Sequence, residues 1–155
     1  PEMILLDEPT TGLDPQARHL IWDKMRELKQ KNHTLILTTH YMEEAEQLCD
    51  MIAFMDAGKI IAMGRPKDLI KEHLASNALE LFIEEAQRPE ILGHFSGTIG
   101  SYADLGQRLT IYAHDTTTLL NELHMRYTNV EIRSRPTNLE DVFLKLTGHQ
   151  LRENA

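Results

Sequence analysis

Short apolar runs alternate with amphipathic stretches along the 155-residue chain. Short apolar runs, as at 3–6 and within the stretch 34–40, are typical of strands buried on both faces of a parallel sheet. Apolar residues recurring every three or four positions predict helices between the runs. The predicted strands lie at 3–6, 34–40, 51–55, 59–63, 78–83, 97–105, 108–113 and 130–133. The predicted helices lie at 15–29, 41–48, 66–74 and 88–95, and after Asp115 and Asn138.

The order of the predicted elements changes near residue 76. Residues 1–75 give the order β-α-β-α-β-β-α, which indicates an α/β domain. Residues 76–155 give β-α-β-β-α-β and a last helix, the order of a ferredoxin-like module. We therefore predict an α/β domain over 1–75 and a small α+β ferredoxin-like domain over 76–155.

Two acids, Asp7 and Glu8, end the first predicted strand, and Pro9 prevents the strand from continuing. The carboxyl ends of strands in open α/β sheets are where ligands bind. Adjacent carboxylates on an extended chain point to opposite sides, so one can hold a cation while the other faces a reacting atom. Nucleotide hydrolysis needs this combination, because Mg²⁺ must be positioned and water must be oriented. A solvated acidic loop is the alternative.

Two further polar residues, His40 and Asp14, lie at the ends of predicted elements. His40 ends the second strand, so a βαβ connection brings it to the same edge of the sheet as the paired acids. A structural histidine is the alternative. Asp14 precedes Pro15 and is predicted to cap the first helix. The acids of the predicted helix at 41–48 are expected to form a solvated face.

Residues 3–15 read Met-Ile-Leu-Leu-Asp-Glu-Pro-Thr-Thr-Gly-Leu-Asp-Pro and closely resemble the Walker B segment and D-loop of ABC-type ATPases. The resemblance implies that Asp7 is the Walker B aspartate, which serves Mg²⁺, and that Glu8 is the catalytic glutamate, which orients water. It makes His40 the H-loop histidine, which contacts the γ-phosphate of ATP. It also implies that Asp14 helps to couple two nucleotide sites across a head-to-tail dimer.

The resemblance extends to the order of the elements. Residues 1–75 are similar to the C-terminal half of an ABC nucleotide-binding domain, so we expect the C-terminal half of a P-loop NTPase sheet. The tail closes with Asn-Leu-Glu-Asp-Val-Phe-Leu-Lys-Leu-Thr-Gly at 138–148 and resembles the accessory domain of drug- and ion-exporting ABC transporters. An unrelated α+β tail is the alternative. We therefore expect a C-terminal fragment of an exporter's ATP-binding subunit, whose N-terminal part is missing before Pro1.

No phosphate loop of the form Gly-x-x-x-x-Gly-Lys-Ser/Thr occurs in the sequence, and neither does the Leu-Ser-Gly-Gly-Gln signature of ABC ATPases. The backbone N–H groups and the lysine of that loop normally cradle the phosphates. We therefore expect this chain alone neither to bind nor to hydrolyse ATP appreciably.

The net charge of −8 is spread evenly, because residues 1–76 hold 13 acids and 9 bases and residues 77–155 hold 11 and 7. This acidic balance argues against nucleic acid and anionic lipid as partners. No apolar run approaches the roughly 20 residues that a spanning helix needs, and no signal peptide is recognised. The single cysteine excludes an internal disulfide and fits a reducing compartment.

The resemblance implies a cytoplasmic ATPase subunit, peripheral on the cytoplasmic face of the membrane. Its partners would be a second ATP-binding subunit and a membrane-spanning permease that exports the cargo. One alternative is a catalytically inert regulatory module in which residues 77–155 dock on a partner. The other is a soluble ABC ATPase that does not transport, which the acidic charge of both halves disfavours if it works on nucleic acid.

Overall fold

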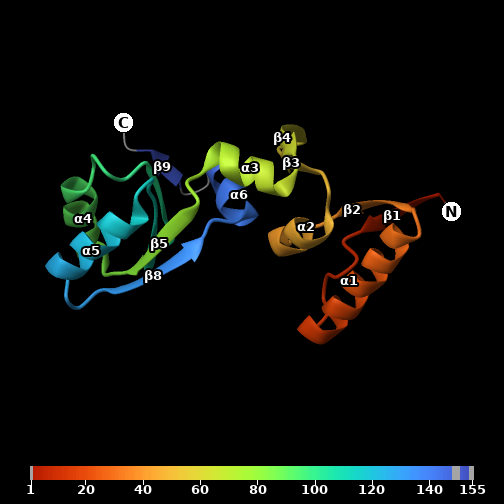
Figure 1. Cartoon of the computed structure of the whole chain (residues 1–155), viewed down its shortest axis with the longest axis horizontal. Helices are drawn as coiled ribbons and strands as arrows, with labels where there is room; N and C mark the ends of the chain where they lie inside the picture. The colour runs from red at the N-terminus through yellow and green to blue at the C-terminus, as the bar shows by residue number, and fades with distance from the viewer. Residues whose placement is uncertain (1, 148–150, 154–155) are drawn as a thin grey trace. The chain divides into compact units, whose positions relative to one another are not determined.

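The computed structural model describes residues 2–147 and 151–153 and has a mixed α/β fold (Figure 1). The chain packs as two compact units, 1–52 and 53–155, each with its own hydrophobic cluster. The predicted boundary after residue 75 concerns the domains of the whole protein and stays a prediction. The first unit contains, in chain order, β1 (Met3–Asp7), α1 (Pro15–Gln30), β2 (Thr34–Thr38) and α2 (Met42–Leu48).

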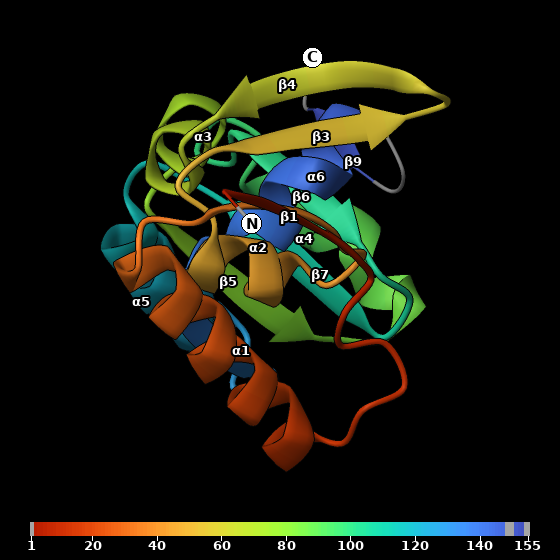
Figure 2. The same cartoon turned by 90° about the vertical axis from the view of Figure 1, so that its right-hand side faces the viewer.

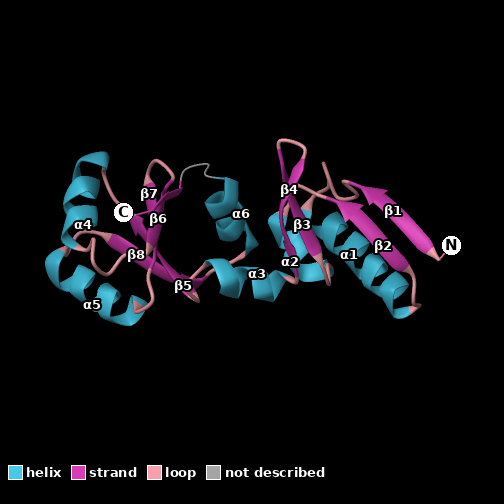
Figure 3. Ribbon diagram, turned by 90° about the horizontal axis from the view of Figure 1, so that it is seen from above, coloured by secondary structure: helices cyan, strands magenta, loops and turns pink. Residues whose placement is uncertain are grey.

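In the first unit, β1 and β2 are parallel neighbours (Figure 3). Their register runs from the pair of Met3 with Thr34 to the pair of Asp7 with Thr38. Both strands therefore end at the same edge, as the predicted βαβ connection requires.

Helix α1 begins where the sequence predicts. The Asp14 Oδ1 atom accepts a hydrogen bond of 2.9 Å from the backbone N–H of Ala17, and proline occupies the first turn. The apolar face of α1 buries Trp22 and Met25. These two side chains cluster with Leu48 of α2 and with partly buried residues of both strands and of α1: Leu6, Ile21, Leu35 and Leu37.

Burial of the two strands on both faces, which the apolar runs predict, is wrong for this structure. Leu5 is 72% exposed, Met3 60% and Ile36 47%. These residues alternate with the ones that face α1, and within residues 2–52 no element covers the second face. An unbroken apolar run indicates a strand whose two faces are both covered. Here α1 covers one face of the two strands, and the other face stays exposed.

The second unit starts with a two-stranded sheet of β3 (Ile52–Asp56) and β4 (Lys59–Gly64), drawn as a long pair of arrows in Figure 2. The turn between them has φ of +46° at Ala57 and +76° at Gly58, the left-handed conformation that glycine tolerates best. The remaining elements are α3 (Pro66–His73), β5 (Asn77–Phe82), the short 3₁₀ helix η1 (Glu85–Gln87), α4 (Arg88–His94), β6 (Ser101–Asp104), β7 (Arg108–Tyr112), α5 (Thr116–Arg126), β8 (Glu131–Pro136), α6 (Leu139–Thr147) and β9 (Leu151–Glu153).

Five of these strands form one antiparallel sheet in the order β8-β5-β7-β6-β9. Strand β7 lies between β5 and β6, so it splits the β5–α4–β6 unit in the manner of a ferredoxin-like module. The β-α-β-β-α-β order predicted from the sequence is thus present. Strand β9 was not among the predicted elements.

One face of the five-stranded sheet carries the largest core of the chain. The alternate residues of β5 and β7 that point to this face have no exposed surface, and they pack with equally buried residues of α4 and α5. Its fully buried members are Leu79, Leu81, Ile91, Leu109, Ile111, Leu119 and Leu123. The helices and the sheet of the second unit thus close a core of their own.

A polar network on Asp141 ties α6 to the sheet. The Tyr112 hydroxyl donates to Asp141 over 2.7 Å, and the Arg135 guanidinium donates to both Asp141 oxygens over 2.7 and 2.9 Å. Asn138 caps α6 as predicted, and its N–H donates to Asp141 over 3.0 Å. Burial opposes ionisation, but these hydrogen bonds hold the pKa of Asp141 below its ordinary value.

Candidate functional site

The carboxyl ends of β1 and β2 are joined by hydrogen bonds between polar side chains and backbone. The Thr38 hydroxyl donates to Asp7 Oδ1 and accepts from the Glu8 N–H over 3.1 Å. The same N–H lies 3.1 Å from the Thr38 carbonyl oxygen. Two predicted site residues, Asp7 and Glu8, are therefore held against the end of the neighbouring strand.

Glu8 lies outside the strand. Its φ of +43° is in the left-handed region, which side chains other than glycine rarely adopt. Glu8 thus stands in a turn, and the expectation that it continues the alternation of the strand is wrong. Such backbone conformations cost on the order of 1–3 kcal/mol and cluster at functional sites.

The turn brings Glu8 to His40, 32 positions later in the chain. Glu8 Oε2 lies 3.2 Å from His40 Nδ1 and accepts a 2.9 Å hydrogen bond from the Thr11 hydroxyl. Both side chains are about half exposed, at 46% for Glu8 and 53% for His40. An acid and a histidine thus meet at an accessible sheet edge, which is an arrangement that can orient water and contact an anion.

Aromatic and cationic groups fix the chain just after His40. The His40 ring lies 4.1 Å from the Tyr41 ring, centroid to centroid, and the Arg18 guanidinium carbon stands 4.6 Å from the centre of the Tyr41 ring. Arg18 belongs to α1, so these contacts connect that helix to the histidine loop.

Asp14 lies at the end of the loop that leads from Glu8 to α1. Its side chain caps the helix, as described above. Gly12, in the same loop, has a φ of +77°, so the turn requires a residue that tolerates the left-handed region. The second role predicted for Asp14, at a dimer interface, stays a prediction.

Glu44 is a buried acid that the sequence reasoning missed. The acids of α2 were expected to be solvated, yet Glu44 has no exposed surface, whereas Glu43 is exposed. Helical spacing would have found it, because Glu44 stands four residues before the buried Leu48 and therefore on the same face. The prediction followed the acidic composition of the helix as a whole and did not consider the position of each acid on it.

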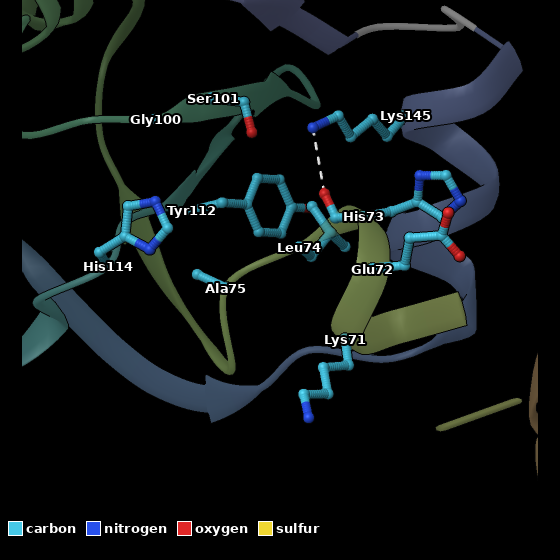
Figure 4. A pocket seen from close by; sticks show the side chains of 10 residues that line it. All are labelled: Lys71, Glu72, His73, Leu74, Ala75, Gly100, Ser101, Tyr112, His114 and Lys145. Atoms are coloured by element: carbon cyan, nitrogen blue, oxygen red, sulfur yellow. Dashed lines mark hydrogen bonds between the residues drawn. The ribbon is translucent and has the colours of Figure 1, made fainter. Parts of the chain in front are cut away.

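A pocket of about 300 Å³ lies in the second unit (Figure 4). Lys145 donates to the His73 carbonyl oxygen over 3.1 Å beside it, and Ser101 and Tyr112 line its sheet side. Glu72, His73 and His114 also line it. Across residues 2–147 and 151–153 there is no group of three or more histidine, cysteine or acidic side chains that could hold a metal ion.

Comparisons with known proteins agree on one family. The model of the C-terminal domain of the nodulation factor export protein NodI matches residues 100–148. The Nod factor export ATP-binding protein I of Rhizobium etli is 43% identical over 99% of this chain, and that of Cupriavidus pinatubonensis is 42% identical over the same share. The resemblance to ABC transporter ATP-binding proteins is confirmed.

The match to these ABC transporter proteins is partial. The chain spans about half the length of the curated relatives, 48% for the Rhizobium protein and 46% for the Cupriavidus protein. A solved ATP-binding subunit of an ABC transporter is 35% identical over 46% of this chain and 30% of its own, with a TM-score of 0.43. Within the described part of the chain, none of the helices has the length and apolar character needed to cross a membrane.

Proposed function

We propose that this chain is part of the ATP-hydrolysing subunit of an ABC exporter. The observation that carries the proposal is the 3.2 Å approach of Glu8 to His40 at the carboxyl ends of two parallel strands. In this proposal Glu8 orients the attacking water, and His40 contacts the γ-phosphate of ATP. Relatives named as ATP-binding export proteins support the same assignment.

The residues at this edge fit a magnesium ion that is shared with phosphates. Mg²⁺ prefers oxygen ligands and is usually bound by one or two carboxylates together with phosphate oxygens and water. Asp7 and the Thr38 hydroxyl supply such oxygens, whereas the described residues form no cage of three acids or histidines. Asp7 would hold the ion directly or through water, and the bound ion would neutralise charge developing on the phosphates.

ATP affinity would come from outside these 155 residues. The sequence contains no phosphate loop, the motif whose backbone N–H groups and lysine normally cradle the phosphates. We therefore propose that the chain alone is inactive and supplies the water-orienting half of a composite site. Asp14 would face a second ATP-binding subunit in a head-to-tail dimer.

The proposed cargo path runs through another protein. A membrane-spanning permease would carry the cargo, while this subunit would work at the cytoplasmic face of the membrane. Nod factor, which the names of the relatives mention, is the first cargo to test. Copurification of the intact protein with a polytopic membrane protein would support this part of the proposal, and copurification with RNA or DNA would contradict it.

The hydrolytic role is tested by Glu8→Gln in the intact protein that carries this sequence. The amide keeps the shape of the side chain but cannot accept a proton from water, so turnover should fall by about 100-fold or more while ATP still binds. Steady-state phosphate release and equilibrium ATP binding measure the two effects. Glu43→Gln, which changes an exposed acid of α2, is the matched control. Turnover at the unsubstituted rate in Glu8→Gln would refute the role.

A further inference from the structure

Helix α2 buries one carboxylate among several acids. The Glu44 Oε1 atom accepts hydrogen bonds from the Thr10 hydroxyl over 2.8 Å and from the Trp22 indole N–H over 2.9 Å. Glu44 Oε2 is also buried, and it has no hydrogen-bond partner among the residues that the structure describes. A single oxygen atom therefore carries both bonds.

These two bonds join three segments of the first unit. Thr10 lies in the loop after β1 and is 1% exposed, Trp22 lies in α1 and is 2% exposed, and Glu44 lies in α2. A buried donor without its acceptor is costly, so the Thr10 hydroxyl and the Trp22 N–H both favour the position that reaches Glu44. The loop is therefore held on both helices.

The loop held in this way is the one that carries Glu8. The Thr11 N–H donates to the Glu8 carbonyl oxygen over 3.1 Å, next to the Thr11 hydroxyl bond to the Glu8 side chain. The Thr10 carbonyl oxygen accepts from the Leu13 N–H over 3.2 Å and so shapes the rest of the turn. A displacement of Thr10 would therefore also shift Glu8, because both residues belong to the same hydrogen-bonded turn.

Glu44 is also close to His40 along the chain, four residues after it. Helix α2 begins at Met42, two residues after the histidine, and the Tyr41 carbonyl oxygen accepts from the Ala45 N–H over 3.3 Å. The first turn of α2 therefore joins the histidine loop to the carboxylate that binds Thr10. Glu44 connects the two loops whose side chains meet at 3.2 Å.

We propose that Glu44 is a positioning residue for ATP hydrolysis, which sets the placement of Glu8 against His40 through Thr10. The inference rests on the proposed function, since it requires Glu8 to orient water. The bonds of Glu44 stabilise the fold whether or not Glu44 acts in hydrolysis. Only a positioning role predicts that their loss lowers kcat while ATP binding is kept.

The test uses Glu44→Leu and Thr10→Val in the intact protein. Each removes one side of the same hydrogen bond, so each should lower kcat by about 10-fold or more while KM for ATP changes by less than about threefold. Thr10→Ser and Glu44→Gln keep the donor and an acceptor and should retain most of the turnover. Glu43→Gln is the control on the same helix.

The same changes in a Glu8→Gln background separate positioning from folding. If Glu44 acts through Glu8, Glu44→Leu or Thr10→Val should cause no further loss of the residual turnover there. Losses of ATP binding parallel to the loss of kcat, or a further loss in that background, would overturn the inference in favour of a structural role. If Glu44→Leu does not fold, the comparison of kcat between Thr10→Val and Thr10→Ser decides between the two roles.

Two outcomes separate this inference from the proposed function. An inactive Glu8→Gln variant together with unchanged kcat in Thr10→Val and Glu44→Leu would overturn the positioning role and leave the proposed function standing. Full turnover in Glu8→Gln would remove the proposed function and the positioning role with it.

Discussion

The two units of this chain differ in how completely each one buries its own apolar residues. The second unit closes a five-stranded sheet with α4 and α5, and seven large residues of that core have no exposed surface. The first unit leaves Leu5 72% exposed and places Glu8 and His40 at an accessible edge. The second unit thus has the more completely closed core, whereas the first carries the acid–histidine pair that we propose for hydrolysis.

Truncation in the core of the second unit should have the largest effect on stability. Leu109→Ala removes a fully buried side chain and should lower the free energy of unfolding of this unit by about 2–5 kcal/mol. Leu5→Ala, on the open face of β1, should change stability by no more than about 0.5 kcal/mol. Urea denaturation measured by far-UV circular dichroism compares them, and equal losses would break the distinction between the units.

Removal of the buried acid that binds α6 to the sheet should cost almost as much. Asp141→Ala removes the acceptor of the Tyr112 hydroxyl and leaves the Arg135 guanidinium with only Glu80 and the Pro136 carbonyl oxygen, so we expect a loss of about 3 kcal/mol. Glu131→Ala is the control, since its pair with Arg133 is exposed and should contribute less than about 1 kcal/mol. A small effect of Asp141→Ala in denaturation would show that the network is not needed for the fold.

Acid should weaken the same network. The pKa of Asp141 is lowered in the folded state, so the unfolded state binds the proton first, and the stabilisation is present above the ordinary value of 3.8. It is lost as the pH falls through the lower folded pKa. The stability difference between the unsubstituted chain and Asp141→Asn should therefore shrink on acidification below 3.8. A difference that stays constant as the pH falls well below 3.8 would contradict this assignment.

Loss of the cap of α1 in the first unit should have a smaller effect than the loss of Leu109 or Asp141. Asp14→Ala removes the acceptor for the Ala17 N–H and should cost about 1 kcal/mol. The chain has one tryptophan, Trp22 in α1, so its fluorescence reports on this unit. A shift of the fluorescence transition, without a matching shift in the second unit, is the expected result.

Much of this architecture could be predicted because local signals agree with it. The Asp14-Pro15 start of α1, the Gly58 turn and the Asn138 cap each lie where the sequence places them. The meeting of Glu8 and His40 also follows from the sequence, because parallel strands joined by a helix end at one edge.

The errors have a common cause in packing that local patterns do not contain. The exposure of Leu5 depends on which elements surround the strand, and an apolar run cannot say how many there are. The burial of Glu44 depends on the donors Thr10 and Trp22, which come from distant parts of the sequence. The left-handed turn at Glu8 is fixed by bonds to Thr38 and Thr11 after folding.

We propose that Glu8 and His40 act as one hydrolytic unit, and a double-substitution cycle is the direct test of that coupling. Phosphate release is measured for the intact protein with Glu8→Gln, with His40→Ala and with both changes. Groups that act as a unit are strongly non-additive, so the double variant should be about as slow as the slower single variant. Losses that multiply in the double variant, or a single variant at the unsubstituted rate, would contradict the account.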